Sequence, residues 1–180
     1  MKILLTYSSL TGNTKKVADG IFEILDKSVT TYLPMSEIEN PEEFVKDFDL
    51  ILIGCWVDKG MPNKEAAEFI QKVKNKKVGL FMTLGASPQS KHAHETLQKS
   101  VELIEKNNNT VVAKFICQGK ISEKLIEFFK TLPPEHPHAL TEEKLKQYEI
   151  AAKHPDQEDI KNAQELFLKV VDELCNSANG

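Results

Sequence analysis

The sequence predicts an α/β protein of three layers, in which helices cover both faces of a five-stranded parallel sheet. Apolar segments alternate with segments of helical spacing along residues 1–119, as they do in βαβ units. Three of the apolar segments lack polar positions almost entirely, as strands covered on both faces do: residues 2–7, 49–54 and 77–85. Thr30, Thr31 and Lys114 mark the two remaining strands as sheet edges. These compositions indicate the strand order 2-1-3-4-5, with a ligand site where the order reverses, between the first and third strands.

Each predicted strand ends at a polar or small-residue loop, and each helix is recognised by an apolar stripe or a cap. The expected strands are residues 2–7, 28–33, 49–54, 77–85 and 110–119. The expected helices between them are residues 14–27, 41–46, 62–73 and 90–106. Val17, Ile21 and Leu25 form the stripe of the first helix. Asn40, followed by Pro41, is typical of the cap that starts the second helix. The third and fourth helices have the stripes Ala66, Phe69, Ile70 and Val73, and Ala93, Leu97, Val101 and Ile104.

The segment between the fifth strand and the last helix is longer than a compact fold needs. We expect residues 119–155 to form a helical insertion beside the C-terminal edge of the sheet, with short helices capped by Ser122 and Thr141. The last helix begins after its cap, Asp156. Its apolar stripe is Ile160, Ala163, Leu166 or Phe167, Val170 and Leu174. Residues 1–180 are thus predicted to form a single domain.

The composition argues against several classes of function. A net charge of −4, no Arg and no basic cluster longer than Lys76–Lys77 make nucleic acid an unexpected partner. No apolar run reaches the roughly 18 residues of a membrane helix, so no membrane insertion is expected. Because the first residues already read as a strand, no signal peptide is expected, and the three scattered Cys residues indicate reduced thiols in a cytoplasm. No Cys or His spacing predicts a metal site.

The loop after the first strand is the most specific feature of the sequence. It reads S-L-T-G-N-T and leads into the first helix, where backbone N–H groups lack partners and the helix dipole favours an anion. Because the chain has no Arg, a phosphate bound here must rest on hydroxyls, amides or Lys. The alternative is that these polar residues only cap the helix. The candidate phosphate-binding residues are Ser9, Leu10, Thr11, Gly12, Asn13 and Thr14.

Two further loops are expected at the same end of the sheet. The second loop contains the only Trp of the chain, whose flat indole can stack on a planar ring or pack as core beneath helix 62–73. Its candidate residues are Trp56, Val57, Asp58, Lys59 and Gly60. The third loop consists mainly of small residues, which let backbone N–H groups approach a ring edge closely. Its candidate residues are Thr83, Leu84, Gly85 and Ala86.

The motif SxTGNT, with the Trp loop and the TLGA loop in support, resembles the flavodoxin family over residues 1–119 and the last helix. The resemblance implies a flavodoxin-like fold, non-covalent FMN and electron transfer, with the first loop on the phosphate and the other two at the flavin ring. The segments WVDKG, GLFMTLGA and CQGK are further similar to a divergent flavodoxin branch of anaerobic bacteria. Members of that branch are often reductases or reductase partners, some of which act on tetrapyrroles.

The sequence departs from the family in the third loop, where many flavodoxins have a Tyr that covers the flavin. The outer face of the ring is then open, or covered by His92, Met61 or the insertion. Lys59 is expected to attract the anionic reduced ring and to raise its potential. The insertion carries Phe128, Phe129, Tyr148 and several His residues. These side chains either line a second site for a tetrapyrrole over the flavin or pack on the sheet edge.

Three functions follow from this interpretation. The first is a cytoplasmic FMN protein that exchanges electrons with a redox partner protein. The second is an FMN-dependent reductase with its own pocket for a small molecule such as a tetrapyrrole. The third is a flavodoxin-shaped binding module without FMN, against which the intact SxTGNT motif argues. No catalytic residue is identified at this stage.

Overall fold

The sheet has the predicted parallel topology. The computed structural model describes residues 1–133, 135–136 and 139–178. Its parallel strands are β1 Ile3–Tyr7, β2 Thr30–Pro34, β3 Leu50–Asp58, β5 Lys77–Leu84 and β6 Thr110–Gln118. They lie in the order β2-β1-β3-β5-β6, which confirms the predicted order 2-1-3-4-5. A short strand, β4 Met61–Pro62, folds back on β3 in antiparallel orientation.

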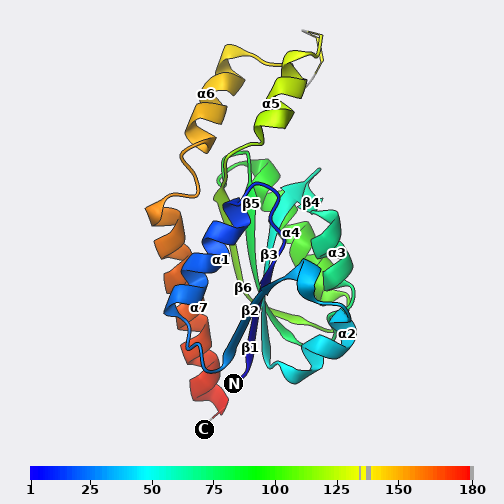
Figure 1. Cartoon of the computed structure of the whole chain (residues 1–180), viewed down its shortest axis with the longest axis vertical. Coiled ribbons are helices and arrows are strands. Elements are labelled where there is room, and N and C mark those ends of the chain that lie inside the picture. Colours follow the sequence, from blue (N-terminus) through cyan, green and yellow to red (C-terminus); the bar gives the residue numbers. More distant parts are fainter. Residues whose placement is uncertain (134, 137–138, 179–180) are drawn as a thin grey trace.

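Helices cover both faces of the sheet, as Figure 1 shows. On one face lie α1 Asn13–Ile24 and α7 Gln157–Ala178, which pack against each other and the sheet. The other face carries α2 Pro41–Phe44, α3 Lys64–Ile70, α4 Lys91–Glu105 and the short 3-10 turns Met35–Glu37 and Val45–Asp47. Of the two alternatives for the α7 stripe, Phe167 is fully buried and packs edge-on against Phe81 of β5, whereas Leu166 is half-buried.

The prediction that residues 55–60 form a loop is wrong for residues 55–58. Strand β3 continues through Cys55 to Asp58, and β4 pairs with its end. The turn between them has positive φ at Lys59 (49°) and Gly60 (75°), the backbone twist that suits a two-residue hairpin. Pro62, expected to begin a helix, is therefore held in β4, and α3 starts at Lys64. Trp56 thus belongs to a strand, which fixes its position more firmly than a loop does.

The predicted insertion is a helical hairpin that stands beyond the carboxyl ends of the strands. Helix α5 Glu123–Lys130 leads away from the sheet and α6 Glu142–Ala151 returns to it (Figure 1). The Thr141 hydroxyl caps α6 by accepting from the Lys144 N–H at 3.2 Å. Ser122 occupies the cap position of α5, but its side chain makes no capping hydrogen bond, so that part of the prediction is wrong. Within the described residues, no helix combines the length and the apolar character that a membrane span requires.

Candidate functional site

The loop between β1 and α1 presents an uninterrupted run of free backbone donors. Gly12 has a φ of 87° and turns the chain into the helix, and an added Cβ there would meet no atom within 4 Å. In the described chain, the N–H groups of residues 9–14 donate to no acceptor. The Ser9 hydroxyl accepts from the Lys15 N–H at 3.2 Å, which closes the loop on the first turn of α1. Such a run at a helix N-terminus can bind an anion without any rearrangement of backbone hydrogen bonds.

Two of the predicted donors make internal contacts instead of facing solvent freely. The buried Thr14 hydroxyl is paired with the hydroxyl of Thr83 at 2.9 Å, which ties the loop to β5. The Asn13 amide nitrogen donates to the Thr11 hydroxyl oxygen at 2.9 Å and to the Lys120 carbonyl oxygen at 2.8 Å. Both amide hydrogens of Asn13 are therefore engaged. The Thr11 hydroxyl accepts one bond and keeps its own hydrogen for a ligand.

The base of the same loop is fixed by a polar network around Ser8. The buried Ser8 hydroxyl donates a short hydrogen bond to the Glu65 carboxylate and accepts from the Asn63 amide at 2.8 Å. Both partners belong to the segment that begins α3. Sequence reasoning missed this network, because the partner residues lie more than 50 positions away and carry no local signal.

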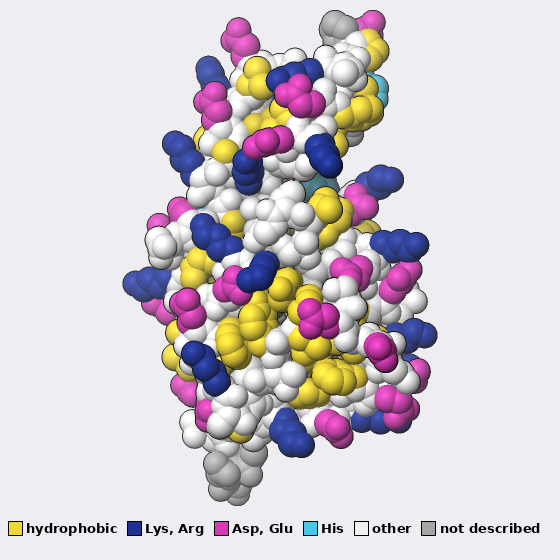
Figure 2. All heavy atoms as spheres, viewed as in Figure 1, with side chains coloured by type: hydrophobic (Ala, Val, Ile, Leu, Met, Phe, Trp, Pro, Cys, Tyr) yellow, Lys and Arg dark blue, Asp and Glu magenta, His cyan; other side chains and the backbone are white. Residues whose placement is uncertain are grey.

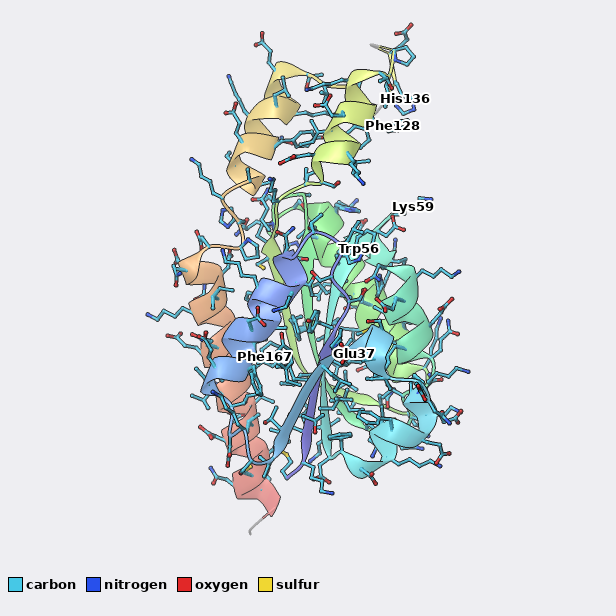
Figure 3. The ribbon with its side chains drawn as sticks, in the orientation of Figure 1. Glu37, Trp56, Lys59, Phe128, His136 and Phe167 are labelled. Atoms are coloured by element: carbon cyan, nitrogen blue, oxygen red, sulfur yellow. The ribbon has the colours of Figure 1, made fainter. Side chains whose placement is uncertain are left out.

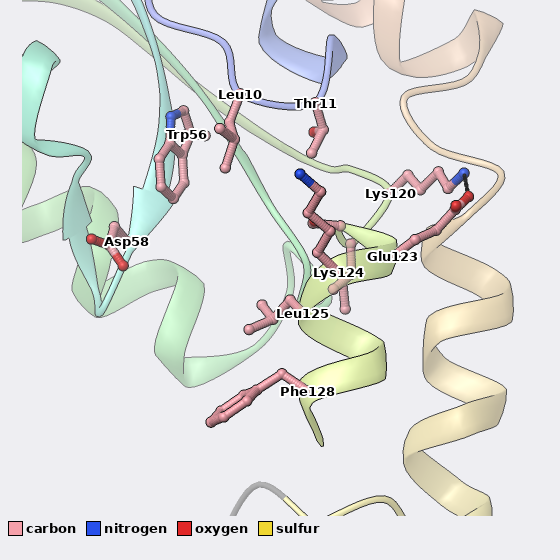
Figure 4. Close-up of a pocket in the computed structure, with 11 residues that line it drawn as sticks. Leu10, Thr11, Trp56, Asp58, Lys120, Glu123, Lys124, Leu125 and Phe128 are labelled. Atoms are coloured by element: carbon pink, nitrogen blue, oxygen red, sulfur yellow. Dashed lines mark hydrogen bonds and ion pairs between the residues drawn. The ribbon is translucent and has the colours of Figure 1, made fainter. Parts of the chain in front are cut away.

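All three predicted loops meet at two adjoining cavities of about 770 and 400 Å³ at the carboxyl end of the sheet, of which Figure 4 shows the larger. Leu10, Thr11 and Trp56 line both cavities. Asp58 lines the larger one, and Val57 the smaller one. The third loop lines the smaller cavity with residues 83–86. The hairpin supplies the remaining wall, which sequence reasoning did not assign to specific residues: Lys120, Ile121, Ser122 and Leu125 line both cavities.

The second loop divides into a part that faces the cavities and a part that does not. The half-buried Trp56 indole lies beside Leu10, which is 67% exposed (Figure 4). Lys59 and Gly60 form the turn beyond the strand and do not line either cavity. Figure 3 shows Lys59 on the outer side of Trp56. A Cβ at Gly60 would lie 3.4 Å from the His92 ring, so this turn packs on α4.

The third loop is held against the stem of the hairpin. The Gly85 carbonyl accepts from the Gln118 amide at 3.1 Å. An added Cβ at Gly85 would lie 2.6 Å from Ile121, so a larger residue would displace the hairpin stem. The N–H groups of Gly85 and Ala86 donate to no acceptor within the described residues. These two N–H groups can donate hydrogen bonds to the edge of a ligand, as expected from the small residues of this loop.

The histidines and thiols contribute little to these cavities. Of the described histidines, only His92 lines one of them. His136 lies at the far tip of the hairpin (Figure 3), and His138 falls outside the described residues. His154 instead pairs with Asp159 at 2.6 Å in the start of α7. Burial raises the pKa of the Cys55 thiol to about 12 and that of Cys117 as well, so both remain protonated.

Comparisons with known proteins agree with this fold. The family model described as "Flavodoxin domain" matches residues 4–168. The flavodoxin-like domain-containing protein BilS of Clostridioides difficile is 34% identical over 178 residues, with 94% of this chain and 95% of that protein covered. BilS of Clostridium symbiosum is 24% identical, with 95% and 96% covered. Oxidised flavodoxin 2 from Bacillus cereus superposes with a TM-score of 0.61 at 20% identity, covering 96% of this chain and 99% of that one. The chain has no Arg, so no guanidinium group lines either cavity.

Proposed function

Because the chain belongs to the flavodoxin family, we propose that it binds FMN non-covalently and transfers electrons through it. The observation that carries the proposal is the run of unpaired N–H groups at residues 9–14, which suits a terminal phosphate. When bound, FMN would supply the redox chemistry, and the protein would hold the ring and exclude water from it. Trp56 would offer a stacking face, and the N–H groups of Gly85 and Ala86 would meet the far edge of the ring.

The proposed setting is a bacterial cytoplasm, with a redox partner protein that docks near the cavities. All three cysteines are free, which agrees with a reducing compartment. The net charge of −4 gives a weak field, so attraction to a basic partner would be modest. Lys59 lies outside the cavities, so its effect on the potential of a reduced ring would act through solvent and be screened.

A visible spectrum and a titration with FMN test the proposal directly. We expect the protein to take up one FMN and to show flavin absorption. Thr11→Val removes a hydroxyl next to the expected phosphate and should weaken FMN binding roughly 10-fold, the effect of one hydrogen bond to a charged group. Thr31→Val, on the exposed part of β2, is the matched control and should bind like the wild type. A colourless protein that takes up no FMN would mean that the fold serves as a binding module without the cofactor.

A second candidate function rests on the apolar wall of the hairpin. Phe128 is 57% exposed and lines the larger cavity with Leu125, while Phe129 and Tyr148 line the smaller one. Figure 2 shows hydrophobic side chains between the charged ones over this hairpin. Apolar walls above the expected position of the flavin suit a planar small-molecule substrate such as a tetrapyrrole. Turnover of such a substrate by the reduced protein alone, without a partner protein, would favour this reductase function over a carrier.

A further inference from the structure

A phosphate bound at residues 9–14 would have neutral donors but no obvious counter-charge. The nearest cation in the sequence, Lys15, is already paired with Asp19 at 2.8 Å on the surface of α1. Neutral N–H and O–H groups can hold a dianion, but a cation beside it adds attraction and selects for charge. An unpaired cation would therefore have to reach this loop from another part of the fold.

Lys124, in the first turn of α5, meets this condition. It lines the larger cavity together with Leu10, Thr11 and Trp56. Figure 4 shows its amine pointing into the cavity on the side of Thr11, whereas the Lys120 side chain runs outward to Glu123. Among the described cations that line the two cavities, Lys124 is the one without a recorded ion pair or hydrogen bond.

The neighbouring charges on α5 leave Lys124 without a partner. Glu123 binds Lys120 at 2.7 Å, and Glu127 binds Lys130 at 2.6 Å. The residue one helical turn later is Phe128, which cannot pair with an amine as a carboxylate does. An ammonium group left free by its own helix, and directed into a cavity with apolar walls, is suited to an anionic ligand.

The stem of the hairpin holds Lys124 at a fixed place relative to the phosphate loop. Asn13 binds the Lys120 carbonyl at 2.8 Å, and the Lys120 N–H donates to the His154 carbonyl at 3.0 Å. The Lys16 amine donates a short hydrogen bond to the Pro155 carbonyl on the returning segment. Both ends of the hairpin are thus tied to the first turns of α1. Lys124 is only four residues beyond the Asn13 contact, so its backbone cannot move far from the loop.

We propose that Lys124 forms an ion pair with the phosphate of the bound mononucleotide, so that the hairpin is part of the cofactor site. This inference rests on the proposed FMN function. It identifies the Lys124 ammonium as the group by which the site would bind a phosphorylated flavin more tightly than an uncharged one. The hydrogen bond from Asn13 to the Lys120 carbonyl is then also part of the cofactor site, because it fixes the position of Lys124 relative to the N–H groups of residues 9–14.

The test compares the affinities of FMN and riboflavin for the wild type, Lys124→Gln, Lys124→Arg and a control, Lys146→Gln, an exposed Lys of α6 that lines neither cavity. Lys124→Gln should weaken FMN binding roughly 10-fold, the low end for a charge-assisted hydrogen bond at an exposed position. Its riboflavin affinity should not change, and its FMN affinity should depend less on salt. Lys124→Arg should retain most of the FMN affinity, and Lys146→Gln should bind both flavins like the wild type.

Two results would overturn the inference while leaving the proposed function intact. One is wild-type FMN affinity in Lys124→Gln. The other is an equal loss of FMN and riboflavin affinity, which would mean that the side chain only packs against the ring. If the wild-type protein binds no FMN, the proposed function itself is wrong. The FMN titration of the wild type shows this before any variant is made. Circular dichroism and a urea titration of each variant verify that it is folded.

Discussion

Asn13→Ala should release the helical hairpin from the domain while leaving the sheet intact. The substitution removes the hydrogen bonds to Thr11 at 2.9 Å and to the Lys120 carbonyl at 2.8 Å. Only the bond to Lys120 joins the hairpin to α1, because Thr11 lies in the same loop as Asn13, so opening of the hairpin should become easier by about 0.5–1.5 kcal/mol. This loss raises the open population of the hairpin roughly 2- to 13-fold.

Limited proteolysis measures this opening. We expect cleavage within residues 119–155 to accelerate by that factor in Asn13→Ala, with a much smaller change for peptide bonds in the sheet. Asn162→Ala, on the exposed face of α7, is the matched control and should be cleaved at the wild-type rate. Equal cleavage rates in Asn13→Ala and the wild type would refute the reasoning, because the hairpin would then be held by other contacts. Gly119→Ala gives a second route to the same loosening, since its Cβ would lie 2.8 Å from the Asn13 amide nitrogen.

The remaining predictions concern the buried hydroxyl pair, the cap of α7 and the thiols. Thr14→Val leaves the buried Thr83 hydroxyl unpaired and should lower the free energy of unfolding by about 1–3 kcal/mol in a urea titration, whereas the double variant with Thr83→Val should recover part of it. Hydrogen bonds from the N–H groups of Asp159 and Glu158 lower the pKa of the Asp156 carboxyl. The ionised carboxylate therefore stabilises the fold at pH values above the ordinary pKa of 3.8. This stabilisation is lost as the pH falls through the lowered pKa of the folded state. Asp156→Asn should therefore be less stable than the wild type at pH 7, and the difference should disappear in acid; a difference that grew in acid would contradict this. Cys175, which is partly exposed, should react with a thiol reagent in the folded protein before the buried Cys55 and Cys117, as mass spectrometry of the labelled peptides would record.

Much of the fold could be predicted because it depends on local patterns. The apolar strands β1, β3 and β5 and the caps Asn40, Thr141 and Asp156 are visible in short windows of sequence, and the structure confirms them. Strand order also followed from composition, since polar residues mark the edges. The extension of β3 to Asp58 was missed, because its partner β4 has only two residues and includes a Pro.

The composition of the site was predictable only in part. The three loops that meet at the cavities carry recognisable residues, and the fold brings Leu10, Thr11, Trp56 and residues 83–86 together there. The hairpin wall was not assigned, because its position depends on contacts between residues more than 100 positions apart, Asn13 with Lys120 and Lys16 with Pro155. The sequence drew attention to Lys59, expected to act on the reduced ring, but gave no sign of Lys124, which the structure directs into the larger cavity.

The central claim is that the free N–H groups of residues 9–14 receive a phosphate. Backbone amide NMR during a titration tests it most directly, because each of these six groups reports its own hydrogen bond. With FMN, we expect the largest downfield proton shifts at residues 9–14, and with riboflavin these shifts should be absent while those near Trp56 remain. Unchanged amide signals at residues 9–14 in the FMN-saturated protein would contradict the account.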